Sequence, residues 1–123
     1  MWQGVLFVFL GSGIGGVVRY VVSTVIQSGA GRWMLPWSTL AVNVAGCFIF
    51  GLVYGFAISW GISKEWKLGL TTGFCGGLTT FSTFSYETLT LVAEGHVWSG
   101  LGYALVSLVA GVAAAWAGYW LTR

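Results

Sequence analysis

Long apolar stretches dominate the chain, and short segments between them carry most of the charged residues. Val, Leu, Ile, Phe, Ala and Gly follow one another without the period-two alternation of apolar and polar residues that is typical of a membrane β-barrel. A helix crosses a bilayer in about 20 residues. The pattern therefore predicts one all-α transmembrane domain over residues 1–123, with four helices at about 2–26, 36–60, 66–93 and 97–121.

Composition indicates that the surface of this domain faces lipid. The chain is 57% hydrophobic and 7% charged, whereas soluble domains carry roughly 25% charged residues. Its mean hydropathy is +0.86. We expect a multi-pass integral protein of the cell inner (plasma) membrane, surrounded by the lipid bilayer. The net charge of +2 comes from too few side chains to neutralise a run of phosphates, so a nucleic-acid partner is excluded.

The basic residues give little instruction for orientation in the membrane. An even number of crossings places both chain termini on one side. Lys64, Lys67 and Arg123 then lie on that side, against Arg32, or Arg32 and Arg19, on the other. This bias is weak for a rule that counts Lys and Arg in loops. The chain either inserts both ways and pairs with its inverted copy, or takes one orientation set by its lysines.

Glycines recur at helical spacing in three of the predicted helices. The pairs are Gly11 and Gly15, Gly51 and Gly55, and Gly73 and Gly77. Such small-xxx-small faces let helix backbones approach closely in a membrane. We interpret these pairs as packing surfaces.

The third predicted helix contains a segment that forms helix poorly. Gly73, Gly76 and Gly77 are followed by Thr79 and Thr80, and each glycine costs up to about 1 kcal/mol relative to alanine in a helix. We expect a break here. Non-helical backbone at membrane depth is tolerated where protein or a watery cavity surrounds it, and freed carbonyls in such breaks commonly bind a cation. The break is either an ion site or a flexible packing joint.

Two phenylalanines follow this break. A helical spacing of 100° per residue places Phe81 and Phe84 on one stripe, with Ser82 and Glu87 roughly opposite. The rings either fill the core or face lipid, or they present their positively polarised edges to a small anion.

Hydrogen-bond donors occur on the other predicted helices. Thr39 and Asn43 share a face of the second helix, and Tyr103 and Ser107 share a face of the fourth. Arg19, near the end of the first helix, either draws anions to an entrance or extends to the membrane surface. A dehydrated anion needs donors and a positive field, whereas a cation needs carbonyls or carboxylates. This lining is typical of an anion pathway.

An enzyme is not expected. His96 is the single histidine, the three glutamates are scattered along the chain, and the spacing of metal ligands is absent. No set of nucleophile, base and orienting group can be assembled from these residues.

Three blocks of residues along the chain form a recognisable pattern. The blocks are Gly13-x-Gly15-Gly16-x-x-Arg19-Tyr20, then Pro36-x-x-Thr39-Leu40-x-Val42-Asn43-x-x-Gly46-x-Phe48, then Gly73-Phe74-Cys75-Gly76-Gly77-Leu78-Thr79-Thr80-Phe81-Ser82-Thr83-Phe84-Ser85-x-Glu87. In this order they resemble the Fluc (CrcB-type) fluoride channel family. The resemblance covers essentially the whole chain, and the third block is highly specific.

The resemblance implies a specific assembly and activity. It implies a four-helix subunit that forms an antiparallel, dual-topology homodimer with two pores, conducts fluoride passively out of the cytoplasm and confers fluoride resistance. It also implies a structural sodium ion at the dimer interface, held by backbone carbonyls of Gly76 and Thr79, and no organic cofactor. Arg19 corresponds to a vestibule residue. The expected pore residues are Phe81, Phe84, Asn43, Tyr103, Ser107, Ser82 and Thr39.

Two other classes of function stay open. The first is a proton-coupled exporter that resembles the small multidrug transporters, in which Glu87 would be the coupling carboxylate. The second is an interaction subunit without transport activity. A further open point is Gly111, which follows Ser107 on the polar face of the fourth helix and interrupts its row of hydroxyl groups.

Overall fold

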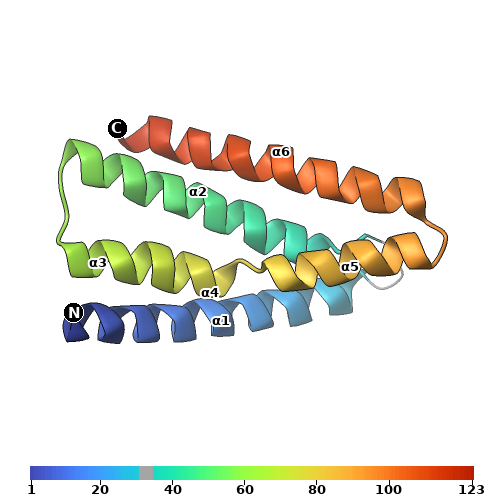
Figure 1. Cartoon of the computed structure of the whole chain (residues 1–123), viewed down its shortest axis with the longest axis horizontal. Coiled ribbons are helices and arrows are strands. Elements are labelled where there is room, and N and C mark those ends of the chain that lie inside the picture. The colour runs from blue at the N-terminus through green and yellow to red at the C-terminus, as the bar shows by residue number, and fades with distance from the viewer. Residues whose placement is uncertain (31–34) are drawn as a thin grey trace.

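The computed structural model describes residues 1–30 and 35–123, and Arg32, one of the basic residues counted above, lies outside them. Within the described residues every regular element is a helix (Figure 1). In chain order these are α1 (Trp2–Ala30), α2 (Trp37–Ser59), α3 (Lys64–Leu68), the π-helix η1 (Gly69–Cys75), α4 (Gly76–Leu78), α5 (Phe81–Ala93) and α6 (Val97–Thr122).

Three helices in the described part of the chain are long and apolar enough to cross a membrane. They are Trp2–Ile26, Trp37–Ser59 and Val97–Thr122. Many of their large apolar side chains are exposed on the single chain, as expected of helices that face acyl chains. The chain is therefore an all-α integral membrane protein, as the sequence predicted.

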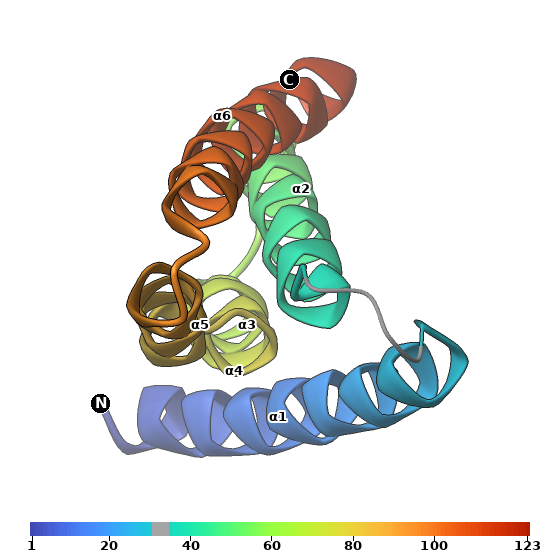
Figure 2. The same cartoon turned by 90° about the vertical axis from the view of Figure 1, so that its right-hand side faces the viewer.

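The remaining segments, from α3 to α5, follow one another in a single line along the bundle (Figure 1). Viewed from the end, α1 crosses one side of this line at a steep angle, while α2 and α6 lie together on the other side (Figure 2). Both termini lie at the end of the bundle where α3 begins (Figure 1).

Glycines bring the backbone of α1 into contact with η1 and α4. A Cβ atom added to Gly11 would overlap the carbonyl oxygen of Gly69, and one added to Gly15 would overlap that of Phe74. From the other side, a Cβ atom on Gly77 would overlap the carbonyl oxygen of Ser12. This is the close approach that small-xxx-small faces permit.

A second glycine seam joins α2 to α6. Added Cβ atoms on Gly51 and Gly55 of α2 would overlap the backbone of the last turns of α6, and one on Gly118 would overlap the carbonyl oxygen of Phe48. The two glycine seams hold α1 against η1 and α4, and α2 against α6.

The third helical segment departs from the prediction at two points. It begins at Lys64, where the Ser63 hydroxyl accepts a hydrogen bond from the Trp66 N–H at 3.3 Å, and it continues as a π-helix that the sequence did not predict. The helix stops after α4, since Thr79 and Thr80 are extended, with ψ values of 159° and 120°. α5 then starts the second half of the segment.

Candidate functional site

Asn43 is bound to the backbone of the break. Its Nδ2 donates to the carbonyl oxygen of Thr80 at 3.2 Å, and its Oδ1 accepts from the Thr80 N–H at 2.8 Å. A primary amide has two N–H donors, so one donor remains for another partner. The break is thereby held against the middle of α2.

Arg19 is bound to the break from the other side. Its Nε donates to the carbonyl oxygen of Gly77 at 3.0 Å. In a continuous helix this oxygen would accept from the N–H of Phe81, so the guanidinium substitutes for a bond that the break removes. The structure thus gives Arg19 a contact that the sequence analysis did not expect.

Thr80 caps the start of α5. Its hydroxyl oxygen accepts from the Thr83 N–H at 3.2 Å and lies 3.0 Å from the Thr83 hydroxyl. Ser82 is exposed, and its hydroxyl lies 3.4 Å from that of Thr80. Sequence reasoning overlooked the roles of Thr80 and Thr83, although a threonine before a helix is a common N-cap signal.

A groove of about 290 Å³ opens beside the break and α5. The hydroxyl oxygen of Ser107 is buried, lies beside Tyr103 and makes no well-formed hydrogen bond among the described residues. The rings of Phe81 and Phe84 have centroids 5.8 Å apart, and Phe81 is 78% exposed on the single chain. Residues from α2, the break, α5 and α6 line the groove, among them Asn43, Thr79, Thr80, Phe81, Phe84 and Ser107.

Tyr103 connects α6 to two residues of α5. Its ring centroid lies 5.3 Å from that of Phe84, and its hydroxyl donates to Oε1 of Glu87 at 3.5 Å. Thr39, which is buried in α2, lies beside both Glu87 and Tyr103. Glu87 and Phe84 therefore face the same partner, and the expectation that Glu87 lies roughly opposite the phenylalanine stripe was wrong. Positions three apart on a helix are neighbours.

A cavity of about 250 Å³ lies on the Arg19 side of the break. Its lining is rich in hydroxyl groups and includes Arg19, Ser38, Thr39, Thr80 and Thr83. Thr80 lines this cavity and also the groove next to Phe81. The Asn43 and Thr80 contact therefore stands between the two spaces.

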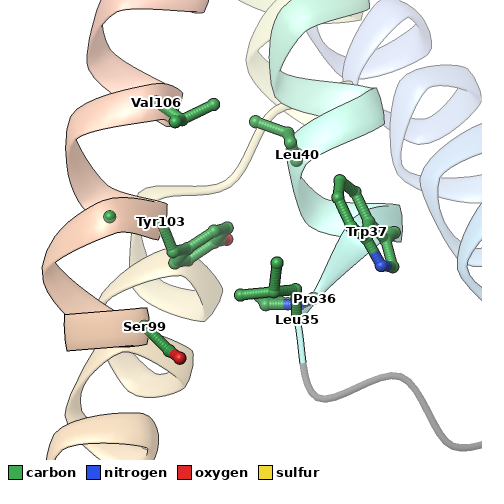
Figure 3. Close-up of a pocket in the computed structure, with 8 residues that line it drawn as sticks. Leu35, Pro36, Trp37, Leu40, Ser99, Tyr103 and Val106 are labelled. Carbon is green, nitrogen blue, oxygen red and sulfur yellow. The ribbon is translucent and has the colours of Figure 1, made fainter. Parts of the chain in front are cut away.

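An apolar pocket of about 290 Å³ lies at the starts of α2 and α6. Figure 3 shows Tyr103 extending from α6 toward α2, with Leu40 and Val106 on one side of it and Pro36 on the other. Its walls are mostly apolar, and the donors along them are on Trp37, Ser99 and Tyr103.

The backbone carbonyls of Gly76 and Thr79 lack the N–H partners that a continuous helix would give them. In a continuous helix these two oxygens would accept from the N–H groups of Thr80 and Thr83. Both N–H groups instead donate to side-chain oxygens. Gly76 is also exposed on the single chain. The carbonyl groups expected to hold sodium thus belong to the part of the helix where the backbone pattern is interrupted.

These features define a multi-pass helical membrane protein whose polar residues converge on a helix break. The chain belongs to the CrcB-like protein family, Camphor Resistance (CrcB), whose sequence model matches residues 6–119. The resemblance seen in the three sequence blocks is confirmed.

Relatives of nearly equal length are named as fluoride-specific ion channels. A Leptospira interrogans protein named fluoride-specific ion channel FluC is 39% identical over 122 residues, which cover 98% of this chain and 95% of the relative. A Pseudomonas syringae protein of that name is 42% identical over 124 residues, covering 100% and 99%. Fluoride-specific ion channel FluC 1 of Streptomyces avermitilis is 42% identical over 118 residues, covering 96% and 94%.

Proposed function

We propose that this protein is a passive, fluoride-selective channel that exports fluoride from the cytoplasm. The names of relatives that align along nearly the whole chain support this substrate. The observation on this chain that carries the proposal is Ser107, whose buried hydroxyl lies beside Tyr103 but makes no well-formed hydrogen bond in the groove that Phe81 and Phe84 line. A buried polar group without a partner costs about 1–3 kcal/mol, and a hydrogen-bond acceptor in the groove would remove that cost.

The chemistry around Ser107 suits a small anion. Asn43 has a remaining amide donor, and the positive end of the α5 dipole begins beside the groove. The edges of the two phenylalanine rings carry partial positive charge. None of the described residues that line the groove carries a carboxylate. These groups replace part of the hydration shell of fluoride, which is the halide that accepts the strongest hydrogen bonds.

The proposed route runs between the two spaces at the break. Arg19 supplies a positive charge to the cavity of hydroxyl groups, where anions collect before they reach the break. Thr80 lines both spaces, and Asn43, which is hydrogen-bonded to Thr80, lines the groove. From Ser107 the polar side chains continue along α6 to Tyr103, with Thr39 and Glu87 beside it. Gly111, which also lines the groove, leaves the far end of this row without a hydroxyl.

We infer that the functional unit is an antiparallel, dual-topology homodimer of four-crossing subunits with two pores. The support is the exposure of Phe81, which is 78% on one chain. A second copy that covers this face would turn an open groove into an enclosed passage. A sodium ion at the dimer interface would be held by the carbonyls of Gly76 and Thr79 from both copies and would neutralise the oxygens that the break exposes.

The proposal is tested by fluoride efflux from liposomes that contain the purified protein, with chloride efflux measured in parallel. Fast fluoride efflux with little chloride efflux is the expected result. Phe81→Ile should slow or abolish fluoride flux without a loss of thermal stability, because this ring is mostly exposed. Trp98→Leu, a change at another exposed aromatic residue remote from the groove, serves as the control. Absence of efflux, or equally fast chloride efflux, would reject the proposal.

A further inference from the structure

Two cations contact a pair of tyrosines at the end of the bundle that holds both termini. The rings of Tyr54, on α2, and Tyr119, on α6, have centroids 5.6 Å apart. Nζ of Lys67 lies 5.9 Å from the centre of the Tyr54 ring, and Cζ of Arg123 lies 5.9 Å from that of Tyr119. The end of α6 and the short helix α3 thus bring one cation each to the same aromatic pair.

The packing of α2 against α6 fixes this arrangement. Gly55 has no side chain where α2 meets the backbone of the last turn of α6. The hydroxyl of Thr122 donates to the carbonyl oxygen of Leu52 at 2.8 Å, which binds the end of α6 to α2. Cζ of Arg123 also lies 4.6 Å from the centre of the Trp120 ring. Its guanidinium is therefore positioned by two aromatic rings next to a fixed helix end.

These two cations lack an acidic side-chain partner. Among the described residues neither Lys67 nor Arg123 forms an ion pair with Asp or Glu. The glutamate nearest to Lys67 in the sequence is Glu65, which lines a different cavity together with Lys64 and the start of α1. The positive charge at the tyrosine pair is thus not balanced by a described acidic side chain.

The surroundings of the pair match the level of lipid headgroups. Arg123 directly follows the membrane-spanning helix Val97–Thr122. Trp116 and Trp120, on the same helix turn as Tyr119, are 64% and 58% exposed. Trp and Tyr gather where acyl chains meet headgroups, and basic residues at this level attract anionic lipids. The exposed indole rings beside the two cations favour a lipid over an acidic protein as the partner.

We propose that Lys67 and Arg123 bind the phosphate of an anionic phospholipid, whose acyl chains lie along Trp116 and Trp120. Arginine presents a planar fork of donors to phosphate oxygens, while the lysine ammonium adds a point charge. The tyrosine rings hold both cations in place by cation–π attraction. This lipid site does not depend on the ion that the protein transports.

Thermal unfolding in neutral detergent, combined with native mass spectrometry, tests this lipid site. Phosphatidylglycerol and phosphatidylcholine with identical acyl chains are added in separate samples. We expect the wild-type chain to retain more phosphatidylglycerol and to unfold at a higher temperature with it. The double variant Lys67→Gln with Arg123→Gln should lose this difference, and each single variant should lose part of it. Lys64→Gln, in the same short helix, is the matched control and should keep it.

Three results would overturn the proposal. The first is an equal response of the wild-type chain to both lipids. The second is a preference for phosphatidylglycerol that is undiminished in both single variants, or that Lys64→Gln lowers as much as they do. The single variants keep the test informative if the double variant fails to fold. The third is an equal stabilisation by soluble glycerol 3-phosphate, which would identify the site as one for free phosphate.

Discussion

The side-chain amide of Asn43 pairs with the backbone of Thr80 in the way that one peptide group pairs with another. One hydrogen bond of 2.8 Å and one of 3.2 Å join the two residues. The break in the third helical segment leaves backbone groups without helical partners at membrane depth, where an unsatisfied group is expensive. Asn43 is therefore needed for the stability of the break as well as for the proposed pathway.

Asn43→Leu should destabilise the protein, because it removes both hydrogen bonds to Thr80 and keeps a side chain of similar size. The expected loss is about 1–3 kcal/mol, the cost of leaving a buried polar group unsatisfied. Unfolding in detergent by heat or denaturant measures this loss. Ser85→Ala is the control, since Ser85 is exposed on α5 and surface changes usually stay within about 0.5 kcal/mol. Equal stability of the two variants would show that the amide contact contributes little.

The sequence was sufficient to predict helices and the place of the break. Uninterrupted apolar runs of the length of a bilayer leave few alternatives to helices, and Gly76 and Gly77 followed by two threonines make helix formation costly. The bonds that Asn43 and Arg19 make to the break were not predictable. These bonds form only if α1 and α2 lie close to the backbone of Gly77 and Thr80. The packing of the glycine seams sets that distance.

Side-chain directions were predicted less well than the helices that carry them. The sequence analysis placed Glu87 and Phe84 on opposite faces of the helix. They are three residues apart, and both contact Tyr103 in the structure. The π-helix was also missed. A π-helix adds a residue to a turn, and its Gly69 and Gly73 lie close against Phe7, Val8 and Gly11 of α1. Composition alone does not report such a contact.

Gly15→Ala should disrupt the bundle, because the new methyl group would overlap the carbonyl oxygen of Phe74. Neither backbone can move away without separating α1 from the helix break. We expect a loss of at least about 1–3 kcal/mol, as is typical of overpacking. Gly16→Ala is the matched control, since no atom lies within 4 Å of its added Cβ atom. A thermal unfolding series that ranks the two variants equally would contradict the close packing of α1.

Ser107→Ala should separate stability from transport. The hydroxyl of Ser107 lies beside Tyr103 but makes no well-formed hydrogen bond among the described residues, so its removal should change the unfolding temperature little. If fluoride accepts a hydrogen bond from this hydroxyl, its loss should slow efflux by about tenfold, which corresponds to about 1.4 kcal/mol. Ser99→Ala, on the same helix but in the apolar pocket, should leave flux unchanged. Unaltered flux in Ser107→Ala would remove the main support for an anion site in the groove.

Glu87→Gln distinguishes a passive channel from a proton-coupled exporter. The glutamine carbonyl can still accept the hydrogen bond of the Tyr103 hydroxyl, so the contact between α5 and α6 should survive and the unfolding temperature should change little. In a passive channel, fluoride efflux follows the fluoride gradient and the membrane potential, and an imposed proton gradient alone should not drive net transport against that gradient. Efflux from liposomes under equal and unequal pH, with the wild-type chain and Glu87→Gln side by side, measures this. Uphill fluoride movement that requires a proton gradient and disappears in Glu87→Gln would assign the carboxylate a coupling role and replace the channel by an exporter.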